Sequence, residues 1–194
     1  MKKERIKFLQ ELKKFWIKEN IPNLTEVNAK FLSFLIDISW AKNVLEIWCA
    51  NGYSTIWIAD ILEKRWWKLT TFDVSLPSFE DAKKNIKKVW LENIVDFNFW
   101  NFLELNLEKD NWEEKIFDFI FIDARKKYSL DFLLKIRKNS KPWTIIFIDD
   151  VIKFRSKMEN LYKYIEWDQK EFEYFVLPVH DEEVLDWVMI LKKK

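Results

Sequence analysis

One stretch, residues 44–55, constrains the fold of this chain more than any other. It begins with an apolar run at 44–47 that predicts a short strand, turns through small and polar residues around Gly52, and enters a segment at 56–62 with apolar residues at helical spacing. A strand, a tight turn and a helix in this order form the opening unit of a parallel α/β sheet. Backbone N–H groups at such a helix start can approach a ligand closely, so this turn is predicted to bind a nucleotide-like molecule.

The same alternation continues through the chain. Helices are expected at 3–17, 25–38, 78–89, 130–137 and 153–166, with a shorter one near 102–108, and strands at 68–73, 95–99, 117–123, 144–149, 172–179 and 184–191. This order predicts an α/β fold, a Rossmann-like three-layer sandwich whose seven-stranded sheet is mostly parallel with an antiparallel C-terminal strand. No linker or repeat interrupts it, so residues 1–194 are expected to form a single domain, with N-terminal helices at 1–40 and a Rossmann-like core at 41–194.

The composition indicates the cellular compartment in which the protein is expected. The chain has 33 basic and 32 acidic residues, so no net charge draws it to nucleic acid or to a membrane surface. Its single cysteine, Cys49, excludes an internal disulfide and suits a reducing compartment. The N-terminus leads into an amphipathic helix without an apolar signal core. These features predict a cytoplasmic protein that makes no membrane contact.

The balance of tryptophan and glycine is unusual. The chain holds 12 Trp and 1 Gly, whereas usual glycine usage of roughly 7% predicts about 14. Several tryptophans occupy positions where glycine is expected in turns and at element ends. They are Trp48 in the ligand turn, Trp40 before a strand, Trp66 and Trp67 in a helix-to-strand turn, Trp90 at a helix end, Trp100 after a strand, Trp143 after Pro142 and Trp187 after Asp186. Our hypothesis is UGA-glycine recoding, in which UGA codons read as glycine by the source organism are written as tryptophan. Trp57, on a helical apolar face, is the candidate for a genuine tryptophan; the alternative is a truly tryptophan-rich protein.

Three motifs, in order, carry a family resemblance. Residues 45–55, with glycine at position 48, resemble motif I of class I S-adenosylmethionine-dependent methyltransferases, and the Gly-Tyr-Ser ending is typical of the catechol and caffeoyl-CoA O-methyltransferase-like group. Residues 121–128 resemble that group's Phe-hydrophobic-Asp-Ala-x-Lys-x-x-Tyr motif, with the tyrosine one place early. Residues 148–151 resemble its Asp-Asn-Val. The similarity extends from about residue 24 to residue 192.

The resemblance implies a set of cofactor-binding residues. Glu46 and the backbone at 48–52 would flank the methionine part of S-adenosylmethionine, and Asn101 would meet the adenine edge. Asp73, which ends a predicted strand 25 positions beyond Trp48, would accept hydrogen bonds from the ribose hydroxyls; its alternative role is a helix cap. The residues implied to bind the cofactor are Glu46, Trp48, Asn51, Gly52, Tyr53, Ser54, Asp73, Asn101, Phe102 and Asp123.

The resemblance also implies a metal site and a catalytic base. Asp123, Asp149 and Asp150 would bind Mg²⁺ or Ca²⁺, which prefer oxygen ligands; the group usually has Asn where this chain has Asp150. Lys126 would be the base, because a neighbouring cation lowers the pKa of its amine. The expected reaction is in-line attack of a hydroxyl oxygen on the sulfonium methyl, so the protein is interpreted as a metal-dependent O-methyltransferase of a small molecule.

The sequence is also compatible with other functions. Some relatives methylate a hydroxylated uridine of tRNA, and lysines of the first helix could contact phosphates. If the tryptophans are genuine, their rings would fill the cofactor cleft and leave a non-catalytic scaffold. The family often dimerises, which leaves a homodimer open. The methyl acceptor is not identified by any motif.

Overall fold

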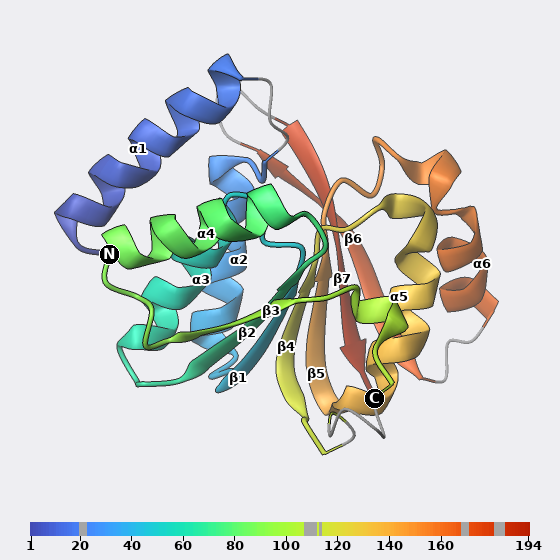
Figure 1. Cartoon of the computed structure of the whole chain (residues 1–194). Helices are drawn as coiled ribbons and strands as arrows, with labels where there is room; N and C mark the ends of the chain where they lie inside the picture. The colour runs from blue at the N-terminus through green and yellow to red at the C-terminus, as the bar shows by residue number, and fades with distance from the viewer. Residues whose placement is uncertain (20–22, 107–111, 113, 168–170, 181–184) are drawn as a thin grey trace.

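Seven strands form a single sheet in the computed structural model, which describes residues 1–19, 23–106, 112, 114–167, 171–180 and 185–194. Their order is β3-β2-β1-β4-β5-β7-β6, and β7 runs antiparallel to both of its neighbours while β1 to β5 are parallel. The predicted mostly parallel α/β sheet is therefore confirmed (Figure 1). The strands are β1 (Asn43–Ile47), β2 (Lys68–Asp73), β3 (Val95–Phe99), β4 (Phe117–Ile122), β5 (Ser140–Ile148), β6 (Phe172–His180) and β7 (Leu185–Lys193).

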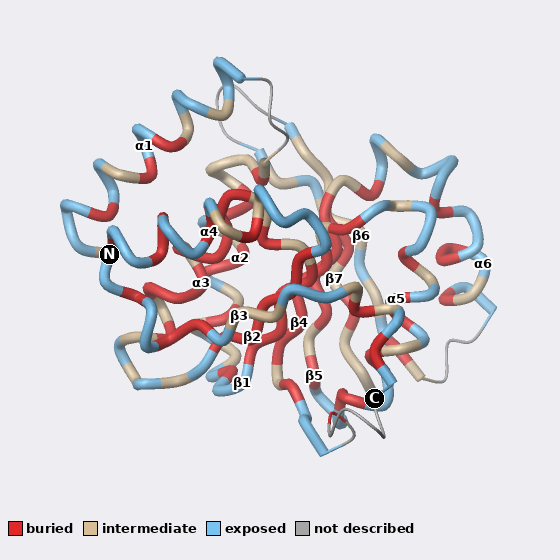
Figure 2. The backbone as a smooth tube through the Cα atoms, viewed as in Figure 1, coloured by how far each residue is buried: buried red, intermediate tan, exposed pale blue. Residues whose placement is uncertain are grey.

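Helices cover both faces of this sheet. Figure 1 shows α2, α3 and α4 on one face with α1 outside them, and α5 and α6 on the other. Each face has its own apolar cluster, and the buried segments concentrate in the central strands (Figure 2). Strands buried on both faces explain the nearly continuous apolar run of β4. The helices are α1 (Lys3–Lys18), α2 (Glu26–Ile38), α3 (Tyr53–Glu63), α4 (Leu76–Lys88), α5 (Ser129–Ile136) and α6 (Glu159–Trp167).

Two predicted helices differ from those observed. The short helix expected near 102–108 is a 3-10 turn at Phe102–Glu104, and 107–108 lie outside the described residues. The helix expected at 153–166 is divided into a 3-10 turn at Arg155–Lys157 and α6. No helix in the described part of the chain is both long enough and apolar enough to cross a membrane.

A buried ion pair attaches α1 to the core. Arg5 is 2% exposed, and its guanidinium donates to Asp60 at 2.8 Å and to Glu63 at 2.9 Å, both on α3. It also donates to the carbonyl of Val89 at 3.1 Å. A buried arginine is costly unless its donors are satisfied, so these contacts fix where α1 lies on the core.

Five tryptophans have a left-handed backbone. The φ angles of Trp40, Trp48, Trp66, Trp90 and Trp143 lie between 54° and 77°. A bulky L-residue rarely adopts this region, because its Cβ approaches the backbone, whereas glycine adopts it freely. Except for Trp48, these side chains are at least 64% exposed, so burial of the indole ring does not compensate for the strain.

The local hydrogen bonds show why the backbone turns left-handed there. Trp90 follows the end of α4, where its N–H donates to the carbonyl of Lys87 and the N–H of Leu91 donates to that of Ile86. This pair of bonds ends a helix with a left-handed residue that is usually glycine. Trp66 follows α3 with the same pair of bonds, to the carbonyls of Glu63 and Leu62, and Trp40 follows α2 with the first bond of the pair, to the carbonyl of Asp37. Each position therefore has the geometry of a glycine helix end.

Trp143 lies in a turn of a different kind. It follows Pro142 and has a φ of 77°. Proline followed by a residue with a φ near 80° is the pattern of a type II turn, whose third position favours glycine or asparagine; here it lies at the start of β5, where the register with β4 shifts. The turn at 141–144 thus also has a glycine geometry.

Candidate functional site

The loop after β1 lies at the carboxyl edge of the sheet and includes residues with a left-handed backbone, which favours glycine. Trp48 has a φ of 76°, and its N–H donates to the carbonyl of Phe72 on β2 at 2.8 Å. Gly52 precedes α3 with a φ of 84°, and a Cβ there would lie 3.1 Å from the Cα of Ala82 on α4. Only glycine meets both demands, a left-handed backbone and the close approach of a second helix.

Asp73 ends β2 with its carboxylate against this loop. Its Oδ2 accepts from the N–H of Ala50 at 2.9 Å, and its Oδ1 accepts from the N–H of Ser75 at 2.8 Å. The N-cap of α4 is Ser75, whose hydroxyl accepts from the N–H of Ser78, so Asp73 does not cap that helix. Oδ2 also accepts from the thiol of Cys49 at 3.7 Å, so the further lone pair is on Oδ1. These bonds orient Asp73 and leave Oδ1 able to accept from a ligand hydroxyl.

Glu46 forms a buried network beneath the loop. Its carboxylate accepts from the hydroxyls of Ser54 at 2.6 Å, Thr55 at 2.7 Å and Thr71 at 2.8 Å. Complete burial raises the pKa of Glu46 from 4.5 to about 7, because the charged form is disfavoured away from water and the three donors offset only part of this cost. Glu46 thus joins β1, β2 and α3 from within.

Replacement of Glu46 by Gln tests this network through the pH dependence of stability. Between pH about 4.5 and about 7 the folded chain binds more protons at Glu46 than the unfolded chain, so the free energy of unfolding falls as pH rises, by up to about 3 kcal/mol, and is level above pH 7. Glu46→Gln should remove this fall. Denaturant unfolding at a series of pH values measures this fall, with Glu159→Gln, at an exposed position of α6, as the control. Parallel curves for wild type and Glu46→Gln would contradict the assignment.

Asp123 and Lys126 form an ion pair just beyond β4. The Nζ of Lys126 donates to Oδ1 of Asp123 at 2.7 Å, and the lysine side chain is 9% exposed. Burial lowers the pKa of Lys126, but the carboxylates of Asp123, Asp149 and Asp150 outweigh burial and raise it above its ordinary value. Lys126 is therefore an ammonium group here. The neutral amine expected of a base requires positive charge added among these carboxylates.

Asp149 and Asp150 follow β5 and adjoin that ion pair. Asp149 is 3% exposed; burial, and then the charge of Asp123, raise its pKa well above the ordinary value. Asp150 has a φ of 57°, a conformation that Asp and Asn tolerate better than most residues. The carboxylate oxygens of Asp149, Asp150 and Asp186 lie within 4.8 Å of one another. A set of oxygen donors this close fits a hard divalent cation such as Mg²⁺ or Ca²⁺.

A cavity of about 940 Å³ joins the loop to these carboxylates. It extends along the carboxyl ends of the strands, where open parallel sheets bind their ligands. The guanidinium of Arg125, which also lines it, lies 5.9 Å from the ring centroid of Trp48. The predicted site residues that line this cavity are Trp48, Asp73, Asp123, Lys126, Asp149 and Asp150.

The other predicted site residues are not among those that line it. The carbonyl of Asn51 accepts from Asn85 at 2.9 Å, and Oδ1 of Asn101 accepts from the N–H of Leu103 at 3.1 Å, which caps a 3-10 turn. The ring of Phe102 packs edge-on against a phenylalanine of β2. Burial raises the pKa of the Cys49 thiol, so that thiol is not a nucleophile. The predicted residues outside the lining are Glu46, Asn51, Gly52, Tyr53, Ser54, Asn101 and Phe102.

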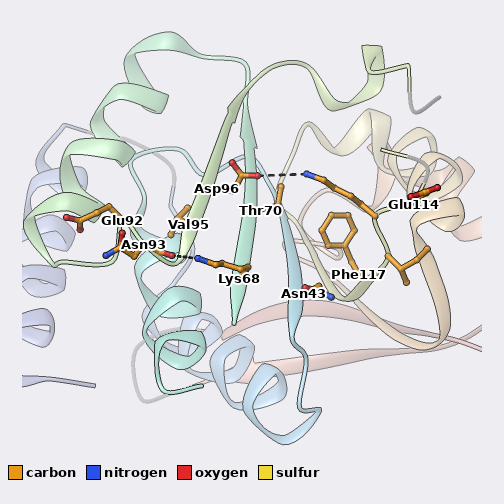
Figure 3. A pocket seen from close by; sticks show the side chains of 11 residues that line it. Asn43, Lys68, Thr70, Glu92, Asn93, Val95, Asp96, Glu114 and Phe117 are labelled. Atoms are coloured by element: carbon orange, nitrogen blue, oxygen red, sulfur yellow. Dashed lines mark hydrogen bonds and ion pairs between the residues drawn. The ribbon is translucent and has the colours of Figure 1, made fainter. Parts of the chain in front are cut away.

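A second cavity, of about 810 Å³, lies at the opposite edge of the sheet (Figure 3). Its lining includes Asn43, Lys68 and Phe117, which begin β1, β2 and β4. An ion pair of 4.0 Å between Lys115 and Asp96 crosses it. The amino edge of a parallel sheet is not where such folds bind ligands, so the first cavity is the candidate site.

Two residues near the carboxylates were not predicted from the sequence. Asp186 is carried by β7, and the amide of Asn28 on α2 donates to Asp149 at 2.7 Å and to Asp186 at 2.9 Å. The sequence gives only a weak signal for Asp186: it precedes Trp187, and with glycine at 187 the pair would be an Asp-Gly sequence, which is typical of a turn and not of a ligand site. Nothing local in the sequence marks Asn28, which looks like any polar residue of a first helical turn.

Known proteins with similar sequences are methyltransferases. The chain is 33% identical over 125 residues to a catechol O-methyltransferase of Niastella koreensis, a match that covers 64% of this chain and 56% of that protein. It is 31% identical to a putative caffeoyl-CoA O-methyltransferase of Arabidopsis thaliana, covering 75% of this chain and 64% of the relative. The chain thus spans between half and two thirds of the length of these relatives.

Solved structures and a family model agree with these sequences. An O-methyltransferase from Bacillus cereus, solved in complex with SAH, superposes with a TM-score of 0.85 and 26% identity, covering 97% of this chain and 91% of that one. A putative caffeoyl-CoA O-methyltransferase from Staphylococcus aureus superposes with a TM-score of 0.79 and 25% identity, covering 96% and 92%. The family model described as O-methyltransferase matches residues 2–171. Because this match covers most of the chain, the protein belongs to the O-methyltransferase family.

Proposed function

We propose that this protein transfers a methyl group from S-adenosylmethionine to a hydroxyl oxygen of a small molecule, with the help of a divalent cation. The observation that carries the proposal is one cavity with Asp73 at one end and Asp123, Lys126 and Asp149 at the other. At the first end, the carboxylate of Asp73 can accept a hydrogen bond from a ribose hydroxyl. At the second end, the acids can bind a cation and the amine of Lys126 can take the proton of an acceptor hydroxyl. Family membership, and the catechol and caffeoyl-CoA names of relatives, support the same reaction.

The residues at the second end act on the proton of the acceptor. A divalent cation held by Asp123, Asp149 and Asp150 would orient the hydroxyl and favour its ionised form. If that cation neutralised the carboxylates, burial would be left as the main influence on Lys126 and would lower its pKa, so its amine could take the hydroxyl proton. The hydroxyl oxygen then forms the O–CH₃ bond as the S–CH₃ bond breaks, and the sulfonium becomes a neutral thioether. Correct alignment of the reacting atoms is the cavity's contribution.

Chelation tests the cation requirement. EDTA should abolish methyl transfer to a catechol acceptor, and excess Mg²⁺ should restore it, because the acids around Lys126 otherwise keep its ammonium form. Transfer of a radiolabelled methyl group measures the rate. A rate unaffected by the chelator would remove the cation from the reaction.

Ligand binding separates this function from its alternatives. Calorimetric titration with S-adenosylmethionine should give saturable binding, whereas a scaffold would give none. Methyl transfer to catechol, but not to tRNA, is the expected result. Salt-dependent tRNA binding together with transfer to tRNA would favour the hydroxyuridine reaction instead.

We also propose that glycine is the natural residue at the five left-handed positions, 40, 48, 66, 90 and 143. Their helix-end and turn geometries favour glycine, and Trp48 lines the cavity at which the cofactor needs bare backbone. Glycine is also expected from the sequence at Trp67, Trp100 and Trp187, but none of the three has a positive φ, and Trp187 lies within β7 and not in a turn, so the backbone does not require glycine there. Trp57, the candidate for a genuine tryptophan, does not have a positive φ either. The coding DNA gives the test: TGA at the five positions supports UGA-glycine recoding, and TGG at them contradicts it.

A further inference from the structure

Asp186 lies beside the carboxylates of Asp149 and Asp150, although it is far from them in sequence; these three residues are called the acidic cluster below. Its carboxylate oxygens are within 4.8 Å of those of Asp149 and Asp150. The antiparallel direction of β7 explains this position, since the start of β7 lies beside the carboxyl end of β5. A strand parallel to β5 would have brought its other end to this edge. The topology thus adds a third strand end to the site.

Asn28 ties this acid to Asp149. Its Nδ2 donates to Oδ1 of Asp149 at 2.7 Å and to Oδ2 of Asp186 at 2.9 Å, and the residue is fully buried. Asn28 lies in the first turn of α2, where Thr25 caps its N–H. The helix start therefore holds one carboxamide between acids of two neighbouring strands.

The two carboxylates that Asn28 joins accept hydrogen bonds, but no basic side chain in the described part of the chain neutralises their charge. Lys126 pairs with Asp123, and Lys153 lies 3.9 Å from Asp150, but no ion pair among the described residues includes Asp149 or Asp186. The Oδ1 of Asn28 is buried with no hydrogen-bond partner in that part of the chain. A half-turn of the carboxamide would place this oxygen, a ligand for hard cations, toward the two carboxylates.

We propose that Asp186 is a further ligand of the divalent cation and that Asn28 is the residue that positions Asp186 against Asp149. This inference rests on the cation requirement of the proposed function. It assigns Asp186 a charge that attracts the cation and Asn28 an amide that holds two mutually repelling carboxylates together. Nδ2 of Asn28 holds the two acids together while the cation is absent; with the cation bound, Oδ1 of Asn28 would face the two acids instead.

Direct Mn²⁺ binding tests the inference without any catalytic assay. The full-length chain, without cofactor or acceptor, is titrated with Mn²⁺ while free Mn²⁺ is followed by electron paramagnetic resonance. Asp186→Asn and Asn28→Leu should each raise the Kd for Mn²⁺ by roughly 10- to 100-fold, the usual effect of losing a group that supports a metal site. Asn28→Asp, which retains oxygen donors, should bind Mn²⁺ at least as tightly as wild type. Asp131→Asn, on the exposed surface of α5, is the matched control.

The outcomes distinguish the two levels of the proposal. Wild type that does not bind Mn²⁺ would overturn the cation requirement and this inference with it. Wild type that binds, with Asp149→Asn weakened but Asp186→Asn unchanged, would overturn the role of Asp186 alone. Equal loss in Asn28→Leu and Asn28→Asp would show that Asn28 only fills space. Circular dichroism confirms folding, and if Asn28→Leu does not fold, Asp186→Asn and Asn28→Asp still decide.

Discussion

Glycine at positions 40, 48, 66, 90 and 143 is expected to raise the thermal midpoint of unfolding and to allow S-adenosylmethionine to bind. Each tryptophan in the left-handed region destabilises the fold by roughly 1–2 kcal/mol. Glycine removes this strain, but its greater conformational entropy in the unfolded chain offsets roughly 0.5–1 kcal/mol of the gain. Five changes should therefore stabilise the fold by roughly 2–5 kcal/mol, which corresponds to roughly 4–20 °C for a chain of this size. Differential scanning calorimetry measures the shift.

Cofactor binding should depend mainly on position 48. The indole of Trp48 lines the cavity beside Asp73, and an indole covers roughly 150–250 Å², a large part of one face of a cofactor. Trp48→Gly alone should then produce most of the gain in affinity, measured by titration calorimetry, while the other four glycines act on stability. Bound cofactor should raise the thermal midpoint further, as mass action requires.

Trp57→Gly is the matched control for these substitutions. Trp57 lies inside α3, packs against the core and does not have a positive φ. Glycine there should destabilise the fold by roughly 0.5 kcal/mol from helix propensity alone, with lost packing in addition. If the tryptophan and glycine forms unfold at the same temperature and bind the cofactor equally, recoding is wrong.

Lys126→Met is expected to lower turnover by roughly 10²- to 10⁴-fold, the usual contribution of a general base. Affinity for S-adenosylmethionine should hardly change, because the lysine pairs with Asp123 at the acceptor end of the cavity and away from Asp73. Wild-type turnover should also rise with pH as Lys126 loses its proton, and this rise should be absent from the variant. Steady-state rates over a pH series, with calorimetric cofactor affinity, measure both effects.

Lys163 provides the control for Lys126→Met. Lys163→Met, on the exposed face of α6, should retain wild-type turnover. Near-normal turnover in Lys126→Met would assign the base elsewhere, and Lys127, which lines the same cavity, would be tested next. A parallel loss of cofactor affinity in Lys126→Met would instead indicate a role in folding or binding.

The sequence by itself determined the sheet and the edge at which the site lies. Apolar runs followed by acids placed Asp73, Asp123 and Asp149 at strand ends, and parallel strands bring all their carboxyl ends to one edge. The left-handed positions could also be anticipated, because helix ends and a turn after proline have a local geometry that a few residues encode. Local rules of this kind need no knowledge of distant segments.

Only the tertiary structure decided which side chains meet in the cavity. Glu46 belongs to motif I, but side chains alternate along β1, so Glu46 lies on the face of Val44 and meets hydroxyls of α3, while Leu45 and Ile47 face the other cluster. Asn28 and Asp186 lie 158 residues apart and meet because α2 packs beside an antiparallel β7. No period or spacing encodes such a meeting, since it depends on how separate elements pack against one another.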